Sequence, residues 1–216
     1  MTISLLTTRA SVDSEDYIDW TGLGTFQINP FTASSAGART LTVSALDTIF
    51  LIMIQGTDWN GNFEDGESVL VTPTEPDQIL RIEFPGDGVY AAGAQIQPDT
   101  SEGAFEAQIE AFAEGNSSLG ALTEVGNSSF TGGNTAIFLG VSSGTPIIAI
   151  EYKILSSQPI TFDRFAINRL DFRLTISESD IPDDTSQYSN QGRYPTPQVH
   201  RTGQGLRYTV PFRYKR

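Results

Sequence analysis

Oxygen-bearing side chains gather in one short stretch, residues 58–67, which reads DWNGNFEDGE. Ca²⁺ takes six to eight oxygen ligands in proteins, so this stretch is a candidate calcium loop. The candidate ligands are Asp58, Asn60, Asp65 and Glu67. It is not an EF-hand loop, because Phe63 stands at the sixth position, where the sharp turn needs glycine. Consecutive hairpin turns explain its Asn-Gly and Asp-Gly pairs equally well.

A second group of oxygen donors surrounds the last strongly apolar segment of the chain. It comprises Asp163, Asn168 and Asp171. Carboxylate and amide oxygens are calcium ligands, so a second calcium site is a hypothesis of the same kind. Calcium is the one cofactor that either group suggests.

The two tryptophans are candidates for sugar stacking or for the core. Trp20 lies between apolar residues, and a core position is the favoured interpretation. Trp59 lies in a loop rich in Gly, Asn and Asp, so it is the better candidate for a ligand-binding aromatic residue.

Catalytic constellations are not expected. Residues 140–144 (GVSSG) match the nucleophile motif G-x-S-x-G, but Pro146 and an apolar strand pattern follow, where the motif requires a helix. This favours a turn. The one histidine, His200, lies in a Gly- and Pro-rich tail. Glu106 and Glu110 share one face of a predicted strand and fit a solvated acidic face better than a glycosidase pair.

Composition narrows the function classes further. The chain has 216 residues and no cysteine, so disulfides and Cys-ligated metals are absent. Its longest apolar run, residues 49–54, is too short to span a membrane. No phosphate-binding loop and no basic aromatic stripe for nucleic acid occur. We therefore expect no enzyme, no nucleic-acid partner and no membrane insertion.

Period-2 patterns between turn formers predict about ten strands and no long helix. They fall at residues 38–44, 49–55, 68–72, 79–84, 89–96, 105–112, 119–125, 137–141, 147–155 and 165–176. Residues 49–55 form a continuous apolar run, typical of a strand buried on both faces. In 105–112 (FEAQIEAF) apolar and polar residues alternate, which predicts one wet face. We expect an all-β, antiparallel two-sheet sandwich of jelly-roll-like form.

Charge divides the chain into a body and a tail. Residues 1–184 hold all 26 acidic residues and seven basic ones, whereas residues 185–216 hold six basic residues and no acid. We therefore expect an N-terminal segment (1–16), a β-sandwich (17–176) and an extended basic C-terminal arm (177–216). The arm residues expected to contact a partner are Arg193, Arg201, Arg207, Tyr208, Phe212, Arg213, Tyr214, Lys215 and Arg216. Residues 206–214 (LRYTVPFRY) could add as an edge strand, since Pro211 is tolerated only at an edge.

Six segments in order carry a resemblance to a known family. They are residues 17–31 (YIDWTGLGTFQINPF), 59–70 (WNGNFEDGESVL), 89–97 (VYAAGAQIQ), 105–120 (FEAQIEAFAEGNSSLG), 136–142 (AIFLGVS) and 165–172 (FAINRLDF). Together they resemble a module of exported cyanobacterial and other bacterial proteins that often carry a C-terminal PEP-type sorting signal. The resemblance implies a jelly-roll-like sandwich displayed outside the cell, with no established chemistry. This chain departs from the family in lacking a leader and the sorting signal, which suggests release by another route, such as on a virion.

Two functions from different classes follow as hypotheses. The first is a structural or adhesive module on the exterior of a multisubunit assembly, a phage virion or a bacterial surface layer, with its basic arm on a neighbouring acidic subunit. The second is a calcium-assisted carbohydrate-binding module that binds surface glycans through Trp59 and nearby carboxylates.

Overall fold

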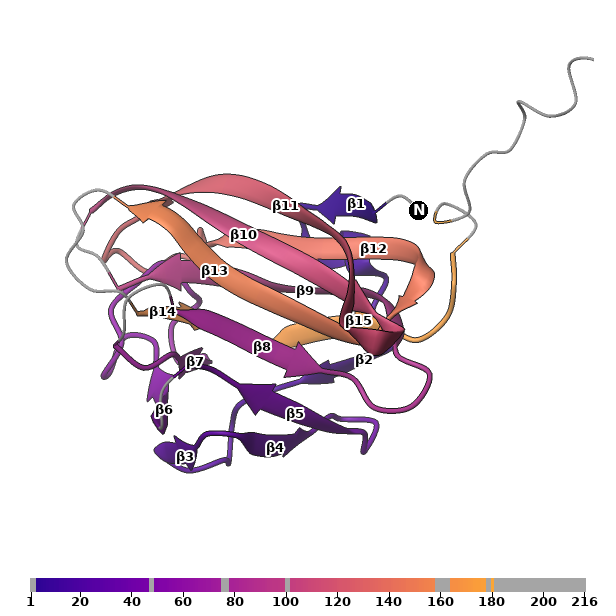
Figure 1. Cartoon of the computed structure of the whole chain (residues 1–216). Coiled ribbons are helices and arrows are strands. Elements are labelled where there is room, and N and C mark those ends of the chain that lie inside the picture. The colour runs from indigo at the N-terminus through magenta and orange to yellow at the C-terminus, as the bar shows by residue number, and fades with distance from the viewer. Residues whose placement is uncertain are drawn as a thin grey trace, which may run out of the picture. The chain divides into compact units, whose positions relative to one another are not determined.

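Two antiparallel sheets face each other in this computed structural model, which describes residues 3–46, 49–74, 78–99, 102–157, 164–177 and 180 (Figure 1). The first sheet contains β1 (Ile3–Leu6), β2 (Asp16–Ile18), β3 (Phe26–Ile28), β6 (Ile49–Ile54), β7 (Ser68–Val71), β9 (Val89–Pro98), β12 (Ile137–Ile147), β14 (Phe165–Ile167) and β15 (Leu170–Arg173). The second contains β4 (Phe31–Ser34), β5 (Thr40–Ser44), β8 (Ile79–Glu83), β10 (Gly103–Ala113), β11 (Ser117–Ser128) and β13 (Ala149–Ser157). The predicted all-β sandwich is confirmed.

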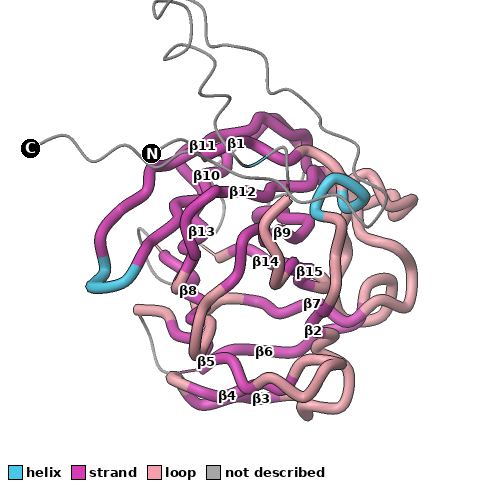
Figure 2. Tube along the Cα trace, turned by 90° about the vertical axis from the view of Figure 1, so that its right-hand side faces the viewer, coloured by secondary structure: helices cyan, strands magenta, loops and turns pink. Residues whose placement is uncertain are grey.

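Strand order places early and late segments side by side. The first sheet runs β1-β12-β9-β14-β7-β6-β3, with β15 pairing to β9 and β2, and the second runs β11-β10-β13-β8-β5-β4. Thus β3 and β4 end their sheets at the same end of the sandwich, as Figure 2 shows. Among the described residues, each of these edge strands pairs with one neighbouring strand only.

The core lies between the sheets and follows the period-2 pattern. On β10, Phe105, Ala107, Ile109 and Ala111 are buried while Glu106, Gln108 and Glu110 are partly exposed, as predicted. Trp20 is fully buried and donates from Nε1 to the Asn168 carbonyl at 2.8 Å, which confirms its core position. Tyr152 is fully buried as well, and burial raises the pKa of its hydroxyl, which donates to the Leu139 carbonyl.

More strands form than the sequence predicted, because several are too short for their alternation to be recognised. Four of the additional strands precede residue 38: β1, β2, β3 and β4. The predicted strand 165–176 divides into β14 and β15, which are separated by Asn168 and Arg169. Apart from this division, the predicted strands shift by a few residues at their ends.

The apolar run at 49–54 forms β6 but is not buried throughout. Phe50 alone is fully buried, while Ile49 and Ile54 are 47% and 42% exposed. The expected burial on both faces is therefore wrong in part. The reason is that β6 lies next to the edge strand β3 and not in the centre of its sheet.

Residues 3–16 join the sandwich, which moves its expected start at residue 17 toward the N-terminus. Strand β1 pairs with β12 from Ile3↔Ser143 to Leu6↔Gly140. A short 3₁₀ turn, η1 (Arg9–Val12), follows, and Thr8 caps it by accepting from the Ser11 backbone N–H. A second such turn, η2 (Glu114–Asn116), links β10 to β11.

The expected C-terminal arm lies almost wholly outside the described residues, which end with 164–177 and 180. In the described part of the chain, no helix has the length and apolarity that a membrane crossing requires.

Candidate functional site

The loop at residues 58–67 holds its oxygen donors apart in different roles. Asp58 Oδ1 accepts the Ile54 backbone N–H at 2.6 Å and so closes the turn after β6. Glu67 accepts two hydrogen bonds from Asn168 Nδ2, at 2.9 and 3.0 Å. Asn60 and Asp65 are exposed. The Asp58 contact stabilises a turn, and the Glu67 contact joins the loop to the segment between β14 and β15.

Trp59 is buried, at 3% exposure, so the structure does not expose its ring as a sugar-stacking position would require. Its ring packs in an apolar cluster with Phe63, Val69 and Val71 on the outer face of the first sheet. Gly61 permits this close packing, since a Cβ atom there would lie 2.5 Å from Trp59 Nε1. The loop therefore folds back and covers part of its own sheet.

Asn168 is saturated with hydrogen bonds. Its Oδ1 accepts from the Gln95 backbone N–H at 2.9 Å and from Arg9 at 3.1 Å. Its Nδ2 donates to Glu67 and, at 2.5 Å, to Gln95 Oε1. One side chain thus joins β9, the loop at 58–67, the N-terminal turn and the segment between β14 and β15.

Asp171 on β15 carries a fully buried carboxylate held between two guanidinium groups. Oδ2 accepts from Arg9 on η1, and Oδ1 accepts from Arg169 at 3.0 and 2.5 Å. Hydrogen bonding to Asp171 raises the pKa of Arg169, whose guanidinium lies 4.2 Å from the ring centroid of Tyr17. Charge neutralisation explains how a carboxylate is tolerated in this position.

The described residues of the two predicted calcium groups do not form a cluster of acidic side chains. Among the described residues, no three acidic or histidine side chains converge as metal ligands would. In the second group, arginines occupy the positions around Asp171 where a cation would bind, and the Asn168 amide presents its NH₂ to Glu67. Asp163 lies outside the described residues.

The serine motif at residues 140–144 is part of a strand. Residues 140–144 lie within β12, so the predicted turn is wrong, and Ser142 is 6% exposed opposite Ser4 of β1. The elbow geometry that activates a serine is therefore missing at this position. His200 lies outside the described residues.

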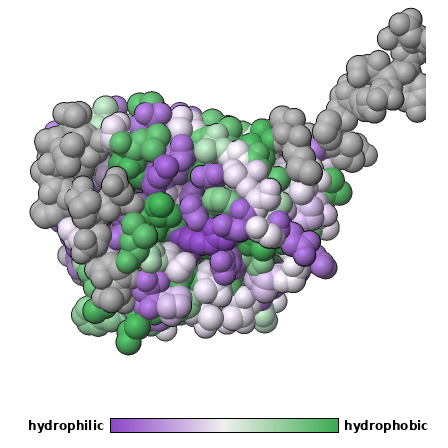
Figure 3. Space-filling model, viewed as in Figure 1, coloured by the Kyte–Doolittle hydropathy of each residue, from purple (hydrophilic) through white to green (hydrophobic). Residues whose placement is uncertain are grey.

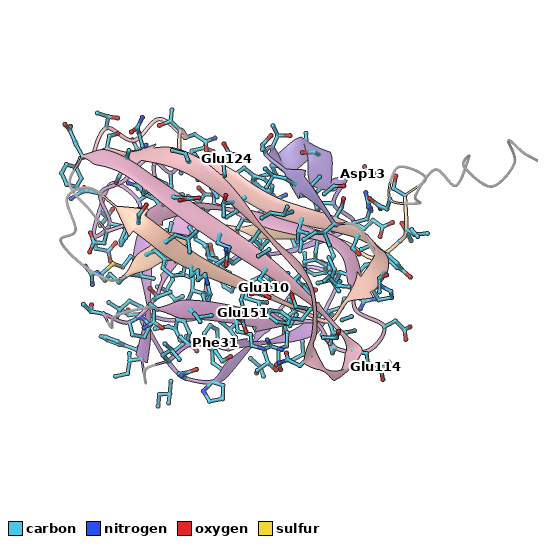
Figure 4. All side chains as sticks on the ribbon, turned by 45° about the horizontal axis from the view of Figure 1, so that its top comes forward. Asp13, Phe31, Glu110, Glu114, Glu124 and Glu151 are labelled. Carbon is cyan, nitrogen blue, oxygen red and sulfur yellow. The ribbon has the colours of Figure 1, made fainter. Side chains whose placement is uncertain are left out.

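The outer face of the second sheet is polar and internally paired (Figure 3). Arg81 donates to Glu83 at 2.9 Å, to Glu151 at 2.7 Å and to Asn116 at 2.8 Å. Glu110 lies opposite Glu151 in the β10–β13 register (Figure 4) and accepts from Ser118 at 2.7 Å. These carboxylates have partners of their own and form a solvated charged face.

An open hollow of about 410 Å³ lies beside the end of β11. Its lining is uncharged: Asn62, Val125, Gly126, Asn127, Ser129, Thr135 and Ile137. The Asn62 side chain fixes one wall by accepting from the Ser129 N–H at 2.8 Å and donating to the Asn127 carbonyl at 2.9 Å. Amide and hydroxyl groups of this kind suit a neutral polar ligand.

An exposed apolar surface lies on the outer face of β3 and β6, at the free edge of the first sheet. We call it the β3–β6 patch; it comprises Phe26 (67% exposed), Ile28 (76%), Leu46 (64%) and Ile49 (47%), with the partly buried Leu51 and Met53 beside them. Cross-strand pairing joins Phe26 to Leu51 and Ile28 to Ile49. Contiguous exposed apolar side chains mark interaction surfaces in soluble proteins.

The sequence that includes β5, β6 and β7 is acidic. Residues 40–80, which build β5, β6, β7 and their loops, contain no lysine or arginine. They contain seven acidic residues, namely Asp47, Asp58, Glu64, Asp65, Glu67, Glu75 and Asp77. Sequence reasoning missed the β3–β6 patch, although the Phe-Gln-Ile alternation at 26–28 was a usable signal. The arm residues predicted to bind a partner lie outside the described residues.

Replacing Asp171 tests whether its buried ion pairs hold the fold. Asp171→Asn removes the charge between two guanidiniums, and we expect the free energy of unfolding to fall by about 3 kcal/mol or more. The matched variant Glu83→Gln, at a carboxylate 48% exposed in its side chain, should cost about 1 kcal/mol or less. Urea unfolding measures both values. Equal losses in the two variants would contradict the structural role of Asp171.

Calcium addition tests the two predicted metal groups directly. Because Asp58, Glu67 and Asp171 already accept hydrogen bonds from the protein, we expect neither binding heat nor a change in melting temperature when Ca²⁺ is added after chelation. Isothermal titration and differential scanning calorimetry measure the two quantities. Saturable heat together with a higher melting temperature would reinstate calcium.

No protein-family model matches the sequence, and no curated protein matches it. Solved structures similar to this chain include a DUF4465 family protein from Bacteroides caccae, at 7% identity and a TM-score of 0.43, over 80% of this chain and 100% of that one. A low-affinity xylan-binding module, CBM86, from Roseburia intestinalis is 15% identical with a TM-score of 0.31, over 62% and 96%. A glycoside hydrolase family 43 arabinoxylan arabinofuranohydrolase from Bacillus subtilis is 10% identical with a TM-score of 0.30, over 73% and 42%. These similarities assign neither a family nor an activity to the chain.

Proposed function

We propose that this chain is a non-enzymatic structural or adhesive β-sandwich protein that assembles on the exterior of a multisubunit structure. In this function the basic C-terminal arm binds the acidic body of a neighbouring subunit. The observation that carries the proposal is the β3–β6 patch, an exposed apolar surface at a free sheet edge of an acidic body. A monomer has no use for such a surface, whereas an assembling subunit buries it.

Electrostatics supports the same function. Residues 1–184 carry a net charge of −19 and residues 185–216 a net charge of +6. Bodies of equal charge repel each other, so a contact of opposite sign favours their association. The arm supplies that contact, and complementary charge also accelerates encounter. The setting that suits such a subunit is extracellular, in a bacterial surface layer or on a virion.

Sedimentation of the full chain tests this function. We expect concentration-dependent assembly at low ionic strength and dissociation as salt is raised, because the Debye length shortens to about 10 Å at 0.1 M. A full-length variant carrying Arg207→Gln, Arg213→Gln, Lys215→Gln and Arg216→Gln should be monomeric under the conditions in which the wild type assembles.

The matched control neutralises two basic residues of the body, with Arg39→Gln and Lys153→Gln, and should retain most of the assembly. A wild-type chain that stays monomeric at every concentration and salt would overturn the proposed function.

The uncharged hollow beside β11 favours a second candidate, glycan binding. Its amide and hydroxyl lining suits the hydroxyl groups of a neutral sugar, and Phe130 next to the lining residue Ser129 is 51% exposed. Neither Trp59 nor calcium is required in this version.

Glycan-array binding separates this candidate from the first. If the hollow binds sugars, Thr135→Trp should abolish binding by filling it, whereas Thr123→Trp, on the exposed face of β11, should leave binding intact. Absence of binding by the wild-type chain would remove the second candidate and leave the first unaffected.

A further inference from the structure

We propose that residues 206–214 of one chain lie across the β3–β6 patch of another, with their even-numbered side chains packed against Phe26, Ile28 and Ile49. This proposal rests on the proposed function, and it names the surface and the segment through which neighbouring subunits would meet.

Residues 206–214 have the alternating pattern of an amphipathic strand. In LRYTVPFRY every even-numbered position is apolar or aromatic: Leu206, Tyr208, Val210, Phe212 and Tyr214. The odd-numbered positions are Arg207, Thr209, Pro211 and Arg213. In an extended strand successive side chains point to opposite faces, so this pattern has one apolar face and one largely basic face. Such a strand gains most by covering an apolar surface on an acidic body.

The apolar layer on the outer face of the first sheet is covered only in part. Trp59 and Phe63 cover the outer face of the first sheet over Val69 and Val71. That apolar layer ends at the partly buried Leu51 and Met53, and beyond it the side chains of β3 are exposed. The β3–β6 patch therefore continues a buried apolar layer that the chain covers only in part.

Residues 206–214 match the β3–β6 patch in length, and the charge of residues 206–216 is opposite to that of residues 40–80. Nine extended residues span about 30 Å at roughly 3.3 Å per residue, enough to cross both β3 and β6. Residues 206–216 carry four basic side chains and no acid, and residues 40–80 carry seven acidic ones and no base. Apolar contact on one face and ion pairing at the rim would therefore occur together.

The chain between Ser177 and Leu206 is long enough to reach a neighbouring subunit. Ser177, the last residue of the described range 164–177, is 29 residues before Leu206. Fully extended, that length spans about 95 Å, which is enough to arrive at the far end of a neighbouring body.

The experiment uses the absence of cysteine from the chain. Full-length Ile28→Cys is mixed with a differently tagged full-length chain that carries one cysteine at a single position from 206 to 214, and the mixture is oxidised mildly. We expect the two chains to cross-link several-fold more at even-numbered arm positions than at odd-numbered ones. Ile28 is 76% exposed, so its replacement leaves the core intact.

The matched control is Val125→Cys, at an apolar side chain 65% exposed on the second sheet, and it should cross-link weakly at every arm position. Equal yields at even and odd positions, or equal yields with Val125→Cys, would overturn the proposal. Dominant cross-linking of Ile28→Cys to itself would overturn it too, because it would mean that two β3 edges pair directly.

The two failures are distinguishable. If sedimentation shows a monomer, the proposed function fails and this inference with it. If the chain assembles in a salt-dependent way but the even–odd difference is missing, the proposed function survives and only the docking of residues 206–214 on the β3–β6 patch is wrong.

Discussion

The buried carboxylate of Asp171 is the interaction on which the frame of the sandwich depends. A charge in this position is tolerated only because Arg9 and Arg169 neutralise it. Arg9 comes from the N-terminal turn, 162 residues away in the chain. The ion pair therefore fastens the first strand and the closing strand to the same sheet, and Asn168 beside it fastens the loop at 58–67. This loop carries Trp59, which covers part of the outer face of the first sheet.

Ion pairs within the body use most of its basic side chains. In the described residues, Arg9, Arg81, Arg164, Arg169 and Arg173 all pair with carboxylates of the same body. The body's own cations are thus largely committed, while its net charge remains strongly negative. Cations that could offset the excess at the surface must come from outside the body, and the tail of the chain is rich in them.

The sequence was sufficient to predict the fold class and most of the strands, because alternation and turn residues are local signals. The Arg9–Asp171 pair could not be predicted in the same way, since nothing near Arg9 indicates a partner 162 residues later. The sequence indicates Asn168 and Asp171 as a polar group with calcium as a hypothesis, whereas the structure pairs Asp171 with two arginines. Side-chain type alone cannot distinguish a metal from an arginine as the neutralising charge. Trp59 was misjudged for a related reason: loop composition does not show where the ring packs.

The position of β6 beside the sheet edge bears on function. A continuous apolar run requires cover on both faces, and the sequence offers two ways to provide it: a central position in the sheet, or another segment laid over an edge. The structure places β6 next to the edge, where Ile28 and Ile49 have no cover among the described residues. Exposure of such side chains is a liability in a free monomer. An amphipathic segment within the same chain, basic where the surface is acidic, meets both requirements at once. Under the proposed docking of residues 206–214, the same sequence that retains an apolar run at this edge also encodes the segment that covers it.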